Sequence, residues 1–127
     1  MQFGRLLAIL CLTLFLVLTG CSMSVHDTTH VKQNLQTIAQ WVESPAAQRG
    51  YIFISGDITR SLAEETTDKI IALDEQDTVE RITLKIDSNG GGTAPFRVIS
   101  NAMRLTKKPV DDVNMGNCYS AACGILA

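Results

Sequence analysis

Histidine is scarce in this sequence of 127 residues, and it is absent after residue 30. The two that occur, His26 and His30, lie in a polar stretch that we predict to be a solvated tether, which cannot hold catalytic or metal geometry. Two late cysteines, Cys118 and Cys123, have no histidine or third cysteine near them in the sequence, which argues against a zinc site. We expect no metal and no other cofactor.

A basic excess is also missing. The chain has 11 lysines and arginines against 13 aspartates and glutamates, which gives a formal net charge of −2. Nucleic-acid binding needs a basic patch or stripe. We therefore expect no nucleic-acid partner, and the chain shows no internal repeat or low-complexity tract that would indicate a repetitive fold.

The first twenty residues carry a single charge, on Arg5, followed by the apolar run Leu6 to Leu18. This run is shorter than the roughly 20 residues that a bilayer-spanning helix needs, so it indicates a signal peptide. It ends in Leu18-Thr19-Gly20-Cys21, which resembles the lipobox of bacterial lipoproteins. There the cysteine is diacylated through sulfur and becomes the new N-terminus. The alternative is an uncleaved N-terminal anchor.

The lipobox implies that Cys21 anchors the protein to a membrane, because two or three acyl chains hold a protein there stably. By resemblance to Gram-negative lipoproteins, Ser22 favours the outer membrane, facing the periplasm. The remaining chain has the size of one small domain. We predict a signal peptide over 1–20, a tether over 21–30 and a domain over 31–127.

Apolar spacing after residue 30 alternates between the helical and the strand period. Ser61 with Glu64 forms a capping box, and Thr93 can cap a later helix. The alternation of strands and helices implies right-handed parallel crossovers and an α/β layer structure. We predict helices over 31–42, 62–75, 94–106 and 120–126, and strands over 51–56, 81–87 and 110–115.

Two turns should carry the chemistry, because sites form at the carboxyl ends of parallel strands. In the first turn, Gly90 and Gly91 allow backbone N–H groups to approach a ligand closely. In the second, Ser120 stands at a strand-to-helix corner, and the N–H of Ala121 is an unsatisfied donor in the first helical turn. A serine facing such amides suits acyl transfer. The structural alternatives are a helix N-cap for Ser120 and a plain tight turn for the glycines.

Cys118 and Cys123 flank Ser120. The cell envelope permits disulfides, although a separation of five residues across a helix start is awkward for the required geometry. The alternative is a pair of small buried free thiols, the usual state of cysteine.

From residue 51 to 127 the chain resembles the Clp protease proteolytic subunit, within the broader Clp protease/crotonase fold. The matching segments are Ile52–Ile58, Ile82–Gly91 and Gly116–Ala122, and their order and spacing both agree. The resemblance implies parallel β-α-β units, with Ser120 as nucleophile and amides of Gly90 or Gly91 and of Ala121 as oxyanion donors. Signal peptide peptidase A and the crotonases share this fold.

The chain departs from the family pattern at Asn89, where the family has proline, and at Asn117–Tyr119, where the family has smaller residues. The family's histidine and aspartate lie downstream of the serine, beyond Ala127. Among the lysines, Lys85 on the strand before the glycine turn is the candidate substitute base. We therefore expect a fold truncated after the start of the nucleophile-bearing helix, and a chain that is inactive alone.

The predicted function is that of an envelope lipoprotein with a Clp-like serine peptidase domain acting on peptides. The alternative is a non-catalytic lipoprotein that binds peptides or partners through a degenerate Clp-like fold. An acyl-thioester enzyme is disfavoured, because coenzyme A chemistry belongs in the cytoplasm. The residues leave the oligomeric state open, a homo-oligomer included.

Overall fold

The structure is a computed structural model that describes residues 25–126, with side chains from residue 32 onward. The chain divides into two compact units, Met1–Gln33 and Asn34–Ala127, and the second contains the sheet. Helix α2 (Val25–Val42) crosses this division and begins six residues before the predicted start at Val31, so that residues 25–30 are helical. The short helix α3 (Pro45–Gln48) follows, with the side chain of Ser44 accepting a hydrogen bond from the N–H of Ala47.

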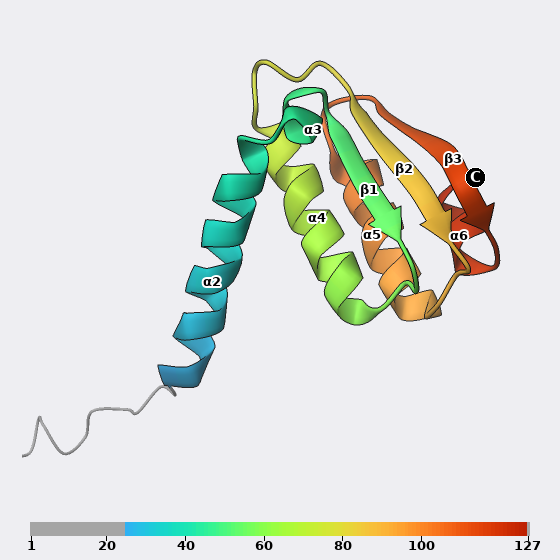
Figure 1. The fold of residues 1–127 in the computed structure, drawn as a ribbon, viewed down its shortest axis with the longest axis horizontal. Coiled ribbons are helices and arrows are strands. Elements are labelled where there is room, and N and C mark those ends of the chain that lie inside the picture. Colours follow the sequence, from blue (N-terminus) through green and yellow to red (C-terminus); the bar gives the residue numbers. More distant parts are fainter. Residues whose placement is uncertain (1–24, 127) are drawn as a thin grey trace, which may run out of the picture. The chain divides into compact units, whose positions relative to one another are not determined.

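The centre of the fold is a parallel sheet of three strands in the order β1-β2-β3 (Figure 1). These strands are β1 (Tyr51–Ser55), β2 (Ile82–Ser88) and β3 (Val110–Cys118). Helices α4 (Arg60–Asp74) and α5 (Thr93–Leu105) connect them, and α6 (Ala121–Ile125) follows β3. The predicted α/β class with parallel β-α-β units is confirmed.

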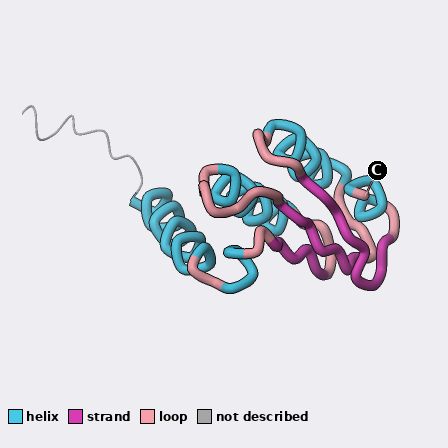
Figure 2. Tube along the Cα trace, turned by 90° about the horizontal axis from the view of Figure 1, so that it is seen from above, coloured by secondary structure: helices cyan, strands magenta, loops and turns pink. Residues whose placement is uncertain are grey.

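One face of the sheet forms the core, and α4, α5 and the short α6 cover it (Figure 2). Side chains alternate between the two faces of a strand, so that every second residue points at these helices. Burying one such isoleucine or leucine contributes about 1.5–3 kcal/mol. The fully buried apolar residues of the sheet are Ile52, Ile54, Ile82, Leu84 and Ile86, and they pack with Ile70 and Leu73 of α4 and Ile99 of α5. On the opposite face, large side chains including Phe53 and Val113 are exposed.

Two predicted helix starts are corrected by one or two residues. The N-cap of α4 is Thr59, whose hydroxyl accepts from the N–H of Leu62 at 3.2 Å, and not Ser61 of the capping box. The hydroxyl of Ser61 pairs with that of Thr59 at 3.1 Å. The N-cap of α5 is Gly92, without a side-chain hydrogen bond, because the helix already includes Thr93.

Strand β3 is longer than predicted. It continues beyond Met115 to Cys118, although its second half is mostly exposed and weakly apolar. Pairing with β2 resumes only at Cys118, and the N–H of Asn117 donates to Oδ1 of Asp87, so this half of the strand is extended without being buried. Within residues 25–126 no helix has the length and apolarity of a membrane span.

Candidate active site

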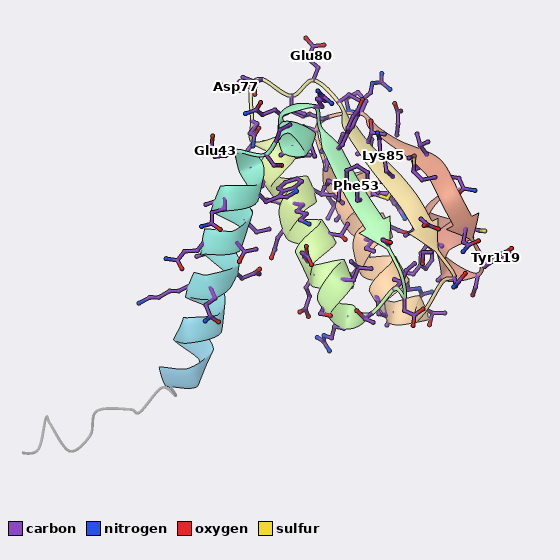
Figure 3. All side chains as sticks on the ribbon, in the orientation of Figure 1. Glu43, Phe53, Asp77, Glu80, Lys85 and Tyr119 are labelled. Atoms are coloured by element: carbon purple, nitrogen blue, oxygen red, sulfur yellow. The ribbon has the colours of Figure 1, made fainter. Side chains whose placement is uncertain are left out.

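The two predicted turns meet at one edge of the sheet. Strand β2 ends at Ser88 and β3 ends at Cys118, and these two residues are partners in the parallel register. The N–H of Tyr119 donates to the carbonyl of Ser88 at 3.1 Å, so the pairing continues into the corner before Ser120. Figure 3 shows Tyr119 at this end of β3.

An irregularity in β3 lies just before the corner. Ile86 pairs with Asn114, and Ser88 pairs with Cys118, so β3 has two more residues than β2 over this stretch. Oδ1 of Asp87 accepts from the N–H of Asn117 at 2.8 Å. A Cβ at Gly116 would lie 2.5 Å from the same oxygen, so a side chain there would push the Asp87 carboxylate away from this position. Such bulges occur beside active sites, where they re-aim the following side chain.

Ser120 has an unusual backbone conformation, with φ 50° and ψ −122°. It is the one non-glycine residue with positive φ in the described part of the chain. Although it occupies the N-cap position of α6, its side chain makes no capping hydrogen bond and is exposed. A non-glycine residue in a sparsely populated region costs about 1–3 kcal/mol, and such strain gathers at functional sites. A strained strand-to-helix corner that exposes a serine hydroxyl is the geometry of a nucleophile elbow.

The glycine turn is held by the buried hydroxyl of Ser88. This hydroxyl donates to the carbonyl of Gly56 at 2.5 Å and accepts from the N–H of Gly90 at 3.0 Å. On its other side the turn pairs with Ile58, whose N–H donates to Gly90 O at 2.8 Å. The Gly90 amide is thus occupied, whereas the N–H of Gly91 has no acceptor within residues 25–126. Of the two predicted glycine donors, Gly91 is the free one.

The glycine turn and the serine corner are in direct contact through Gly90. A Cβ at this residue would lie 2.6 Å from the carbonyl oxygen of Tyr119, 2.9 Å from Cβ of Ser120 and 3.2 Å from the backbone nitrogen of Ala121. The φ of Gly90, 97°, also favours glycine. The N–H of Ala121 opens α6 and has no acceptor in the part of the chain that the structure describes. The corner therefore presents the hydroxyl of Ser120 and the free N–H of Ala121 against Gly90, which directly precedes the free N–H of Gly91.

No side chain within the described range 32–126 hydrogen-bonds to the hydroxyl of Ser120. Lys85, the predicted substitute base, lies on the open face of the sheet, and its Nζ is 3.8 Å from the centroid of the Tyr51 ring. Figure 3 shows Lys85 over the sheet, beside Phe53 on the neighbouring strand. The side chains of His26 and His30 lie outside the described ones. Among the residues that are described, no group of three or more His, Cys, Asp or Glu could hold a metal ion.

The two cysteines beside Ser120 are free thiols, Cys118 half-buried and Cys123 exposed. Sγ of Cys123 donates to the backbone carbonyl of Cys118. The expectation of two buried thiols therefore fails for Cys123. Desolvation raises the pKa of the Cys118 thiol to about 11, and the hydrogen bond and charge of Cys123 and the charge of Asp112 act in the same direction.

Comparison with known proteins identifies the family of this chain. The family model described as Clp protease matches residues 23–127. The chain belongs to the Clp protease family. The family predicted from the segments Ile52–Ile58, Ile82–Gly91 and Gly116–Ala122 is thereby confirmed, and so is the predicted fold class.

Two Clp relatives illustrate the likeness. The chain is 26% identical over 102 residues to the ATP-dependent Clp protease proteolytic subunit 2 of Treponema denticola. This alignment covers 80% of this chain and 51% of that protein. A mutant ClpP1 from Listeria monocytogenes superposes with a TM-score of 0.60 and 26% identity, over 67% of this chain and 48% of that one. The chain thus spans about half the length of the Clp proteins that it matches.

Proposed function

We propose that this chain carries the nucleophile-bearing part of a Clp-like serine peptidase, with Ser120 as the nucleophile. The observation that supports this most is the strained, uncapped conformation of Ser120, beside the free amide of Ala121 and in contact with the glycine turn. In the proposed reaction, Oγ of Ser120 attacks the carbonyl carbon of a peptide bond. The N–H groups of Gly91 and Ala121 then donate to the oxyanion that develops. In a well-studied protease, loss of one such donor lowers kcat by about 10²–10³-fold.

We also propose that these 127 residues alone do not hydrolyse peptides. A serine hydroxyl is a weak nucleophile until a general base accepts its proton. No base contacts Ser120 within residues 32–126, and both histidines of the sequence precede the domain. Without the other triad members, such a site retains roughly 10³–10⁴-fold over the reaction in water, which is far from enzymatic function. Activity would then require a base from residues that this sequence does not contain.

A fluorophosphonate probe tests the state of Ser120. We expect the 127-residue chain to show no labelling above background, because the hydroxyl has no base to activate it. The measurement is intact-mass analysis after incubation with the probe, with Ser120→Ala as the matched control. Stoichiometric labelling that disappears in Ser120→Ala would show an activated serine and contradict the proposed inactivity.

A non-catalytic binding protein is the second candidate, and it is favoured because no base among the described side chains hydrogen-bonds to Ser120. The nucleotide sequence beyond codon 127 separates the two candidates. An open frame with a histidine about 25 residues after Ser120, and an aspartate further on, supports the peptidase, because these residues complete the triad. A stop codon directly after codon 127 supports the binding protein.

We further propose that the protein is a lipoprotein of the cell envelope, anchored through Cys21. Cys21 and Ser22 lie outside the described residues, so the proposal rests on the sequence of the lipobox. We expect cells that express the protein to incorporate labelled palmitate into it, and Cys21→Ala to abolish the label. Unchanged labelling of Cys21→Ala would contradict lipidation at this residue. Cys11→Ala, which alters a cysteine inside the predicted signal peptide, serves as the control and should keep the label.

A further inference from the structure

Cys118 and Cys123 lie on either side of the Ser120 corner and are in contact. Cys118 is the last residue of β3 and Cys123 the third residue of α6, so only the tight turn through Tyr119 and Ser120 and two alanines separates them. The thiol of Cys123 lies against the backbone of Cys118, to whose carbonyl it donates. This hydrogen bond holds the sulfur of Cys123 beside the residue that carries the other thiol. The fold has thus already brought together two cysteines that are free.

We propose that Cys118 and Cys123 are a redox-active dithiol, which a disulfide oxidant converts to an intramolecular disulfide that encloses Ser120. This inference does not depend on Ser120 being a nucleophile. It goes beyond the proposed peptidase, because it assigns a modification site to two side chains that acyl transfer does not use.

The different surroundings of the two thiols assign their order in the reaction. Cys123 is exposed, so an oxidant meets it first. Its thiolate attacks the oxidant disulfide, forms a mixed disulfide and releases one thiolate of the oxidant. Cys118 is half-buried and has a raised pKa, so it acts second. On losing its proton to water, its thiolate attacks Sγ of Cys123 and releases the second thiolate of the oxidant. The two released thiolates take up two protons, which replace those that the two cysteines lose. Two thiols are oxidised to one disulfide, and one oxidant disulfide is reduced to two thiols.

Oxidation of the folded chain by glutathione disulfide, followed by alkylation and mass spectrometry, tests the proposal. No lysine or arginine follows Lys108, so trypsin leaves Cys118 and Cys123 in one peptide, apart from Cys11 and Cys21. We expect this peptide to lose two hydrogens and to take up no alkylating reagent. Cleavage after Tyr119 should leave its two halves joined. If both cysteines stay alkylatable, or stop at mixed disulfides with glutathione, the proposal is wrong.

An equilibrium measurement shows whether the fold favours the bond. At a fixed ratio of glutathione to its disulfide, we expect a larger fraction of the Cys118–Cys123 disulfide in the folded chain than in urea. A smaller fraction in the folded chain would mean that the fold opposes the bond, which overturns the proposal.

The single variants test the order of attack. Cys118→Ser should accumulate a glutathione adduct on Cys123, because the exposed thiol still reacts and has no partner to displace the adduct. Cys123→Ser should take up much less glutathione on Cys118. Equal adducts on the two variants would overturn the assigned roles.

Discussion

Gly90→Ala is expected to destabilise the domain by about 2–5 kcal/mol, because it places a methyl group between the two turns of the site. The new Cβ would lie 2.6 Å from the carbonyl oxygen of Tyr119 and 2.9 Å from Cβ of Ser120. Backbone cannot rotate away as a flexible side chain can, so the Ser120 corner must shift or Gly90 must abandon its φ of 97°. The measurement is the free energy of unfolding from urea denaturation.

Gly56→Ala is the matched control for this change. Gly56 also has a positive φ, 78°, but a Cβ there meets no atom within 4 Å. Alanine at this position therefore carries only the conformational cost, about 1–2 kcal/mol. Both substitutions restrict the unfolded chain equally, so this effect cancels in the comparison. Equal losses for the two variants would show that Gly90 and Ser120 are not in the contact described above.

The sequence predicted the layers of the fold well, because burial leaves a periodic pattern. Ile52 and Ile54, with every second residue of the strand from Ile82, mark the buried face of the sheet. Helix ends were less accurate, because Thr59, Ser61 and Thr93 are all good N-cap residues and local sequence does not choose among them. The exposed half of β3 was missed, because it leaves no buried apolar pattern and returns to the pairing with β2 only at Cys118.

The residues of the site could be predicted from the sequence, but their hydrogen bonding, backbone conformation and exposure could not. Gly90 and Gly91 look equivalent in sequence, and they differ because the hydroxyl of Ser88, whose role was missed, occupies one amide. Ser120 matches a plain helix N-cap until its positive φ and unbonded side chain are seen. The exposure of Cys123 likewise depends on where the short α6 packs, which no local pattern specifies. Contacts between distant segments decide all three.

The hydroxyl of Ser88 connects the elements that shape the site. It joins the exit of β1, through the carbonyl of Gly56, to the glycine turn after β2, through the N–H of Gly90. Gly90 in turn touches Ser120. The position of the candidate nucleophile therefore depends on the buried hydroxyl of Ser88, which does not itself contact Ser120 through a hydrogen bond. Since this hydroxyl occupies the Gly90 amide, it also determines which amide of the turn is free.

Ser88→Ala is therefore expected to cost about 2–3 kcal/mol of stability and to loosen the turn. The substitution leaves the buried N–H of Gly90 without an acceptor, and an unpaired buried donor costs about 1–3 kcal/mol. It also removes a donor from the carbonyl of Gly56, which is less buried and regains water in part. Urea denaturation measures the loss, and hydrogen exchange at the Gly90 amide, which should become faster, shows where it arises.

Ser100→Ala is the control that separates this role from the general cost of deleting a serine hydroxyl. The buried Oγ of Ser100 in α5 has no hydrogen-bond partner among the described residues. Its removal leaves nothing newly unpaired, and alanine is the better helix former, so the variant should be as stable as the parent or more stable. If Ser88→Ala is equally harmless and leaves Gly90 exchange unchanged, the hydroxyl does not hold the turn. The free amide would then have to be explained by the backbone pairing of the turn with Ile58 alone.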